Sequence, residues 1–133
     1  MSNVKNKHKP RILLIEDDEV IQFVIQRLLE NIGYAVDVAT TGVEALIKAS
    51  KGYSLIFSDI GLPNISGIDV AKIIRAHEKK GSYTPIIGLT VFPLETIQDE
   101  CISAGMDCVY SKPINEATLA EIITIYDKAS LMA

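Results

Sequence analysis

The chain has 133 residues, of which 48% are hydrophobic and 23% charged, so it is long enough for one compact domain and too short for two of ordinary size. Its formal net charge of −4 argues against direct binding to nucleic acid, because phosphate contacts need clustered lysines and arginines. No apolar run approaches the length of a membrane span, and two cysteines make no disulfide framework. These features favour a cytoplasmic protein that makes no membrane contact.

The first half of the chain predicts a polar tail followed by two strand–helix pairs. Residues 1–10 are polar and basic, without periodicity, and are typical of a tail or linker. Continuous apolar runs and helical spacing then predict, in order, a strand at 11–16, a helix at 18–32, a strand at 34–39 and a helix at 42–50. Gly33 ends the first helix, and Thr40 or Thr41 caps the start of the second.

The second half predicts three more such pairs. They are a strand at 53–58, a helix at 67–79, a strand at 84–90, a helix at 94–105, a strand at 108–111 and a helix at 115–130. Asp59 follows the third strand at once, and Pro93 suits the first turn of the fourth helix. Strands that alternate with helices in this way predict a parallel sheet covered on both faces, a doubly wound α/β domain over residues 11–130.

Acidic, hydroxyl and basic side chains follow the predicted strands. They are Glu16, Asp17 and Asp18 after the first strand, Asp59 after the third, Thr90 at the end of the fourth, and Ser111 and Lys112 at the end of the fifth. All these ends share the sheet edge where open α/β sheets bind ligands. If the first and third strands are neighbours, the carboxylates crowd one crevice and need a cation among them to stay ionised. Oxygen ligands that are partly open to water favour Mg²⁺ over Zn²⁺.

An aspartate beside Mg²⁺, with a hydroxyl and a lysine opposite, is suited to attack phosphorus. Carboxylates form aspartyl phosphates, and Lys112 and Thr90 would stabilise charge on the phosphoryl oxygens. Each residue alone has an ordinary explanation. Asp18 is more often a plain helix cap, Asp59 a turn residue, Thr90 a strand-end hydroxyl and Lys112 a surface charge. Their conjunction at one edge is what favours phosphoryl chemistry.

Four sequence blocks resemble those of response-regulator receiver domains, the CheY-like superfamily. They are ILLIEDDE, the segment around Asp59, IIGLT and YSKPI, in this order, and the resemblance covers about residues 10 to 128. It implies a flavodoxin-like, five-stranded parallel sheet of order 2-1-3-4-5. It also implies that Asp59 accepts a phosphoryl group from a phosphohistidine on a histidine kinase or a histidine phosphotransfer domain. The isolated domain would then be no enzyme beyond its own phosphorylation and dephosphorylation.

The same resemblance assigns roles to individual residues. Thr90 and Lys112 match the hydroxyl and the lysine that contact the phosphoryl group. The implied magnesium ligands are Asp17 directly, Glu16 mainly through water, Asp59, and Gly61 through its backbone carbonyl. The bond between Lys112 and Pro113 is expected to be cis, although most X-Pro bonds are trans.

The sequence departs from the family pattern at two places. Many receivers carry an aromatic residue three positions before the lysine, where this chain has Val109 with Tyr110 beside it. The residue after the threonine is commonly small, but here it is Val91, followed by Phe92 and a proline. The first departure argues against aromatic switching, and the second suggests restricted access of water to the phosphoryl group.

Two further segments, RAHEKKG and AGMDCVYSKPI, look most like receivers of hybrid histidine kinases. A stand-alone receiver and an excised one both remain compatible with the sequence. Three other functions or protein classes fit parts of the pattern. A haloacid dehalogenase-type phosphatase would need Asp-x-Asp where this chain has Asp17 and Glu19. A flavodoxin-like electron carrier would need a phosphate loop where this chain is acidic. A degenerate receiver would be expected to lack the aspartate, threonine or lysine.

Overall fold

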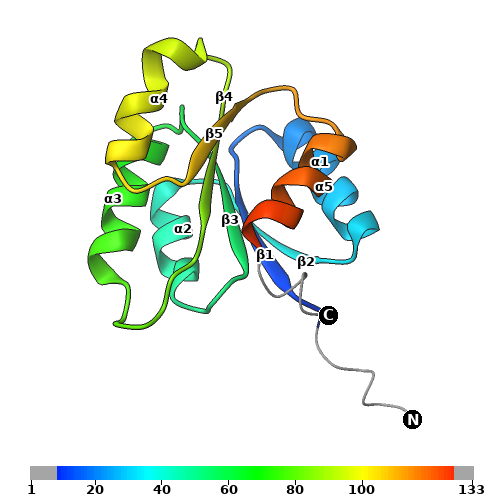
Figure 1. Cartoon of the computed structure of the whole chain (residues 1–133), viewed down its shortest axis with the longest axis horizontal. Helices are drawn as coiled ribbons and strands as arrows, with labels where there is room; N and C mark the ends of the chain where they lie inside the picture. Colours follow the sequence, from blue (N-terminus) through cyan, green and yellow to red (C-terminus); the bar gives the residue numbers. More distant parts are fainter. Residues whose placement is uncertain (1–8, 128–133) are drawn as a thin grey trace.

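The computed structural model describes residues 9–127, which form one parallel sheet covered by helices on both faces (Figure 1). The strands are β1 (Arg11–Ile15), β2 (Ala35–Ala39), β3 (Leu55–Asp59), β4 (Ile86–Thr90) and β5 (Cys108–Ser111). All neighbouring pairs are parallel, and the strand order is β2-β1-β3-β4-β5. The predicted doubly wound sheet and its order are therefore confirmed.

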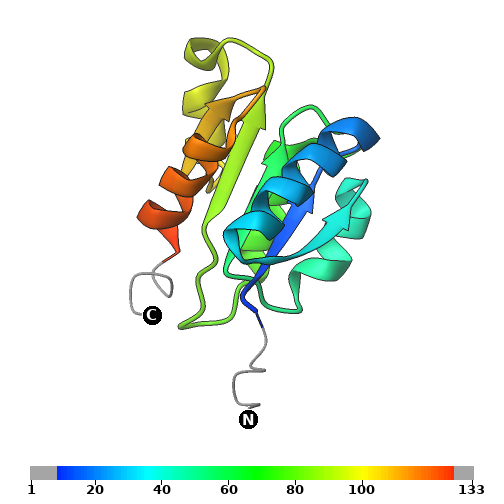
Figure 2. The ribbon, with the colours of Figure 1, turned by 90° about the vertical axis from the view of Figure 1, so that its right-hand side faces the viewer.

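The helices lie in two layers. They are α1 (Glu19–Ile32), α2 (Gly42–Ala49), α3 (Gly67–His77), α4 (Leu94–Ser103) and α5 (Glu116–Tyr126). Figure 1 shows α1 and α5 on one side of the sheet and α2, α3 and α4 on the other. In Figure 2 the strand arrows all point to the same end of the molecule, so the residues that follow the strands gather at that end.

Each face of the sheet carries its own apolar core. Along β1, Leu13 and Ile15 belong to the core under α2 and α3, while Ile12 and Leu14 belong to the core under α1 and α5. Every residue of β3 and β4 is buried. Central parallel strands have helices on both faces, which is why their sequences are continuous apolar runs rather than alternating ones.

The helix starts follow from local capping. The Asp18 carboxylate accepts hydrogen bonds from the backbone N–H groups of Val20 (2.9 Å) and Ile21 (3.0 Å), so its expected role as a cap is confirmed. Of the two candidate threonines, Thr41 caps α2 by accepting from the N–H of Glu44 at 3.0 Å. Pro93 is the N-cap of α4 rather than a residue of its first turn.

Several observed strands and helices are shorter than the sequence predicts. The fourth strand begins at Ile86, because Pro85 has no N–H and the N–H of Thr84 is bonded to the Glu78 side chain at 3.2 Å. Tyr53 and Ser54 precede the third strand, which includes Asp59 as its last residue. The remaining observed ends are Ile15 for the first strand, Ala35 for the start of the second, and Ala49, His77 and Ser103 for the second, third and fourth helices.

The last helix ends at Tyr126, and the N–H of Asp127 still donates to the carbonyl of Ile123 at 2.9 Å. Residues 128–130 of the predicted helix, and most of the predicted tail, lie outside the described residues. Both cysteines are free; Cys108 is half-buried and Cys101 is fully buried. Within residues 9–127 no helix is both long and apolar enough to cross a bilayer.

Candidate functional site

Three acidic side chains meet where β1 and β3 end. The two strands are neighbours, and their register pairs Ile15 with Ser58, so Glu16 and Asp59 follow side by side. Ligand oxygens of Glu16, Asp17 and Asp59 all lie within 4.8 Å of one another. Glu16 is only 1% exposed and Asp59 7% exposed, whereas Asp17 is open to solvent. The crowding of carboxylates expected from the strand order is therefore present.

Lys112 reaches this cluster from the loop that follows β5, two strands away from β3. Its Nζ lies 3.0 Å from Glu16 Oε1 and 3.3 Å from Asp59 Oδ1. Its backbone N–H donates to the carbonyl of Thr90 at 2.8 Å, which fixes the start of the loop after β5. The following bond to Pro113 is cis, as expected. A single buried ammonium group is thus shared between two buried carboxylates.

The buried charges at the site shift one another's pKa values. Burial raises the pKa of Glu16, and the nearby Asp59 charge adds to the effect, while the N–H of Asp18 and the Lys112 ammonium partly oppose it. Burial by itself lowers the pKa of Lys112, but the hydrogen bond to Glu16 and the two carboxylate charges outweigh it and raise the pKa. Lys112 is therefore firmly cationic, and Glu16 is a carboxylate whose negative charge is costly without a cation.

The loop after β1 is held in place by contacts within the loop and with α1, the helix that follows it. The Glu16 side chain accepts from the N–H of Asp18 at 3.1 Å. The side-chain amide of Gln22 on α1 donates to the backbone carbonyl of Glu16 at 2.5 Å. Gln22 carries no signal in the sequence that would mark it as a site residue, because a polar residue on a surface helix has no distinguishing pattern.

The loops after β3 and β4 complete the rim of the site, which is the set of loops around the acidic cluster. Asp59 Oδ1 accepts from the N–H of Gly61 at 3.1 Å. Thr90 is 1% exposed and ends β4, next to Leu89, the register partner of Asp59. The Thr90 hydroxyl oxygen accepts from the N–H of Phe92 at 2.9 Å. A Cβ placed on Gly61 would lie 3.8 Å from the Phe92 ring, so the exposed ring stands beside that loop.

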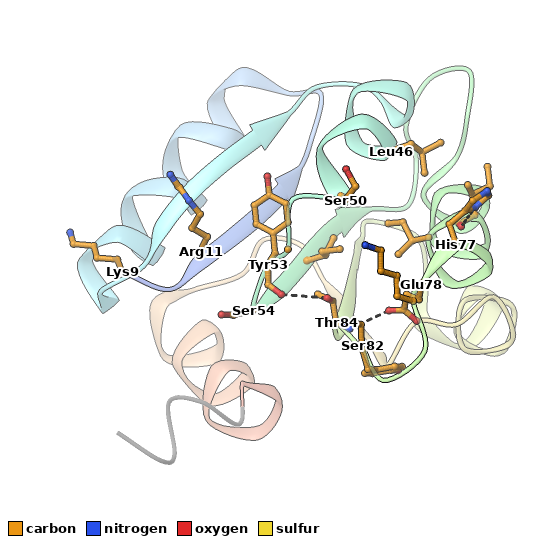
Figure 3. Close-up of a pocket in the computed structure, with 17 residues that line it drawn as sticks. Lys9, Arg11, Leu46, Ser50, Tyr53, Ser54, His77, Glu78, Ser82 and Thr84 are labelled. Atoms are coloured by element: carbon orange, nitrogen blue, oxygen red, sulfur yellow. Dashed lines mark hydrogen bonds between the residues drawn. The ribbon is translucent and has the colours of Figure 1, made fainter. Parts of the chain in front are cut away.

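The cavity shown in Figure 3 lies at the opposite end of the sheet. Its volume is about 970 Å³, and Lys9 and Arg11 at the start of β1, Tyr53 before β3 and His77 at the end of α3 are among its lining residues. A hydrogen bond from the Thr84 hydroxyl to the Tyr53 carbonyl (3.4 Å) crosses it (Figure 3). None of the predicted site residues lines this cavity, so it is separate from the acidic cluster.

Comparison with known proteins agrees with this geometry. Residues 12–124 match the model of the family described as the response regulator receiver domain. The chain belongs to that family. It is a receiver domain of two-component signal transduction, and its sheet order is the one that the family resemblance implied.

Solved receiver structures superimpose closely on this one. One is the receiver domain of a Pseudomonas aeruginosa sensor histidine kinase, with a magnesium ion coordinated in its active site cleft. It is 34% identical, has a TM-score of 0.81, and the match covers 90% of this chain and 98% of that one. Another is the receiver domain of the Saccharomyces cerevisiae response regulator Ssk1, crystallised with the histidine phosphotransfer protein Ypd1. It is 26% identical with a TM-score of 0.81, and the match covers 92% of each chain.

The curated relatives are much longer proteins. Hybrid signal transduction histidine kinase F of Dictyostelium discoideum is 37% identical over 122 residues, which are 89% of this chain and 11% of that protein. The first relatives are matched over 7–16% of their own length. The receiver domain described here therefore corresponds to one part of each such kinase.

Proposed function

We propose that the receiver domain accepts a phosphoryl group on Asp59 from a phosphohistidine, in a Mg²⁺-dependent phosphorelay. The observation that carries the proposal is the buried contact of Lys112 with both Glu16 and Asp59, beside the exposed carboxylate of Asp17. The Asp59 carboxylate, held at the sheet edge with the Lys112 ammonium against it, is placed to act as a nucleophile. The domain, taken as residues 11–130, would catalyse only its own phosphorylation and dephosphorylation.

The transfer step uses groups that this chain provides. An Asp59 carboxylate oxygen attacks phosphorus; the new O–P bond forms as the N–P bond of the phosphohistidine breaks, and the histidine nitrogen keeps the electron pair. Lys112 already lies 3.3 Å from Asp59, so its ammonium group can stabilise the negative phosphoryl oxygens. The Thr90 hydroxyl accepts from Phe92 and still has its own proton to donate to a phosphoryl oxygen.

The acidic cluster fits a magnesium ion. All its donors are oxygens, two carboxylates are buried beside one that faces solvent, and burial already makes the Glu16 charge costly. We assign Asp17 and Asp59 as direct ligands, Glu16 mainly through water, and the Gly61 carbonyl as a backbone ligand. When bound, Mg²⁺ would neutralise charge on the transferring phosphoryl group.

We further propose that the phosphoryl donor is a histidine kinase or a histidine phosphotransfer domain that docks over the site rim and α1. The exposed face of α1 carries Val20, Phe23 and Val24, and Phe23 is 61% exposed. Together with Phe92 beside the site, these residues supply apolar contact area for a helical partner. The parent protein would be a cytoplasmic hybrid sensor histidine kinase, with no direct contact to nucleic acid or membrane by this domain.

Mass spectrometry tests the assignment of the phosphoacceptor. After treatment with acetyl phosphate and Mg²⁺, the intact protein should gain one phosphoryl group, and it should gain none in EDTA. Asp59→Asn should abolish the gain, whereas Asp69→Asn, an exposed aspartate in the first turn of α3, should leave it unchanged. Full labelling of the Asp59→Asn protein would show that another residue is the acceptor.

A further inference from the structure

Gln22 ties the first turn of α1 to the acidic loop at two points. Its side-chain amide donates to the carbonyl of Glu16 at 2.5 Å, and its backbone N–H donates to the carbonyl of Asp18 at 2.9 Å. One helical residue therefore holds the backbone on either side of Asp17.

The carbonyl that Gln22 holds controls where Asp17 points. The C=O of Glu16 and the N–H of Asp17 belong to one planar peptide unit, so fixing one fixes the other. The N–H of Glu16 is already bonded to the carbonyl of Ala39 at 3.0 Å. Because residue 16 is 1% exposed, water does not readily replace a lost partner there. Among the described residues, no hydrogen bond is found to the Asp17 carboxylate itself, so the position of this carboxylate depends on the backbone that carries it.

We propose that Gln22 is a positioning residue that orients Glu16 and Asp17 for magnesium binding. The inference rests on the proposed magnesium site and adds a residue that would not contact the ion. Groups that orient ligands from outside typically contribute about 10- to 100-fold to metal affinity. We expect the lower end here, because the hydrogen bond acts on the ligand's backbone rather than on a ligand atom.

A matched pair of substitutions tests this role. Gln22→Met removes the amide while keeping a straight side chain of similar length and helix propensity. Gln26→Met makes the same change one turn later, where the amide donates to the Glu30 carboxylate at 3.2 Å, away from the acidic cluster. Mg²⁺ titrations followed by amide chemical shifts of residues 59–61 give the dissociation constant. We expect the dissociation constant for Mg²⁺ to rise about tenfold in Gln22→Met and to stay unchanged in Gln26→Met.

Melting temperatures in EDTA separate positioning from simple stabilisation. If Gln22→Met lowers the melting temperature but leaves the dissociation constant for Mg²⁺ unchanged, the proposal is wrong. If Gln22→Met does not fold, Gln22→Asn replaces it: the amide remains but is one methylene too short to hold the Glu16 carbonyl, and the same weakening is expected. Absence of magnesium binding to the unmodified protein would instead refute the proposed function, so the two failures are distinguishable.

Discussion

The two ends of the sheet differ in how their carboxylates are balanced by cations. At the carboxyl end, three carboxylates lie close together, and the Lys112 ammonium contacts two of them, Glu16 and Asp59. At the amino end, the guanidinium of Arg75 is surrounded by acceptors from three separate segments. They are Glu78 (2.7 Å), Asp107 (3.0 Å) and the carbonyls of Thr84 (2.8 Å) and Gly105 (2.9 Å).

The Arg75 cluster is also closed by neutral partners. The Tyr83 ring lies 4.1 Å from the guanidinium carbon, and its hydroxyl donates to Asp107 at 2.6 Å. The other Asp107 oxygen accepts from the N–H of Ile86 at 2.8 Å. Here both carboxylates, Glu78 and Asp107, contact the guanidinium, and the contacts join the end of α3 to the start of β4 and the loop before β5. The comparison suggests that one end stabilises the fold, while the other keeps an excess of negative charge for a ligand.

The largest expected effect is a loss of stability on breaking the Arg75 cluster. Arg75→Met would leave Asp107 and Glu78 partly buried without a cation, which costs about 3 kcal/mol of unfolding free energy. Urea denaturation measures it. Lys72→Met, an exposed position on the same helix, should change stability by about 0.5 kcal/mol or less. A loss for Arg75→Met no larger than this control would show that the amino end is not the stabilising one.

The second effect concerns magnesium at the carboxyl end. Because Mg²⁺ would bind the native site and not the unfolded chain, a concentration of a hundred times its dissociation constant should add about 2.7 kcal/mol of stability. Asp17→Ala should abolish this gain and most of the phosphorylation. In EDTA the same variant should be at least as stable as the parent, because one of three crowded carboxylates is gone.

Asp69→Ala is the control for this measurement, since it removes an exposed aspartate outside the cluster. Its stability should rise with Mg²⁺ as much as that of the parent. An undiminished rise in Asp17→Ala would mean that the ion binds elsewhere.

The contrast between the two ends also explains what the sequence could predict. The carboxyl end follows from topology: buried parallel strands are apolar runs, and the residues at or just after their ends, such as Glu16, Asp59 and Lys112, must meet at one edge. The order of β1 and β3 came from the family resemblance, and the register in the structure confirms it.

The amino end could not be predicted in this way. Arg75 lies in a charged stretch that is typical of a solvated helix end, and its partners Gly105 and Asp107 are 30 and 32 residues away. Only the packing of α3 against the loop before β5 brings them together. The same limit applies to Gln22, whose partner is a backbone carbonyl, and to the start of β4, which depends on the side chain of Glu78.

A smaller effect is expected at the rim of the acidic end. The Phe92 ring stands beside Gly61 and would shield the phosphoryl group from water. Phe92→Ala should therefore speed loss of the phosphoryl group about fivefold, which corresponds to about 1 kcal/mol in the barrier. The decay is followed by intact mass after the phosphodonor is removed. Phe23→Ala removes an exposed ring from α1 (61% exposed, against 48% for Phe92) and should leave the half-life unchanged. Equal half-lives in both variants would contradict the shielding role.

The smallest expected effect is on the outer face of α4 and α5. Val109 is buried in the core that contains Met106, whereas Tyr110 packs with the core on the other face, so neither supplies an aromatic ring that could move inward behind Thr90. With Mg²⁺ and beryllofluoride, which mimics the phosphoryl group, amide shifts should change mainly in residues 88–95 and 109–113. The fixed Arg75 contacts before β5 should limit any wider movement. Sedimentation should show no new dimer, since a relay receiver needs only its rim and α1 to be recognised. Strong dimerisation through α4 and α5 would instead show that the acidic end drives an output switch.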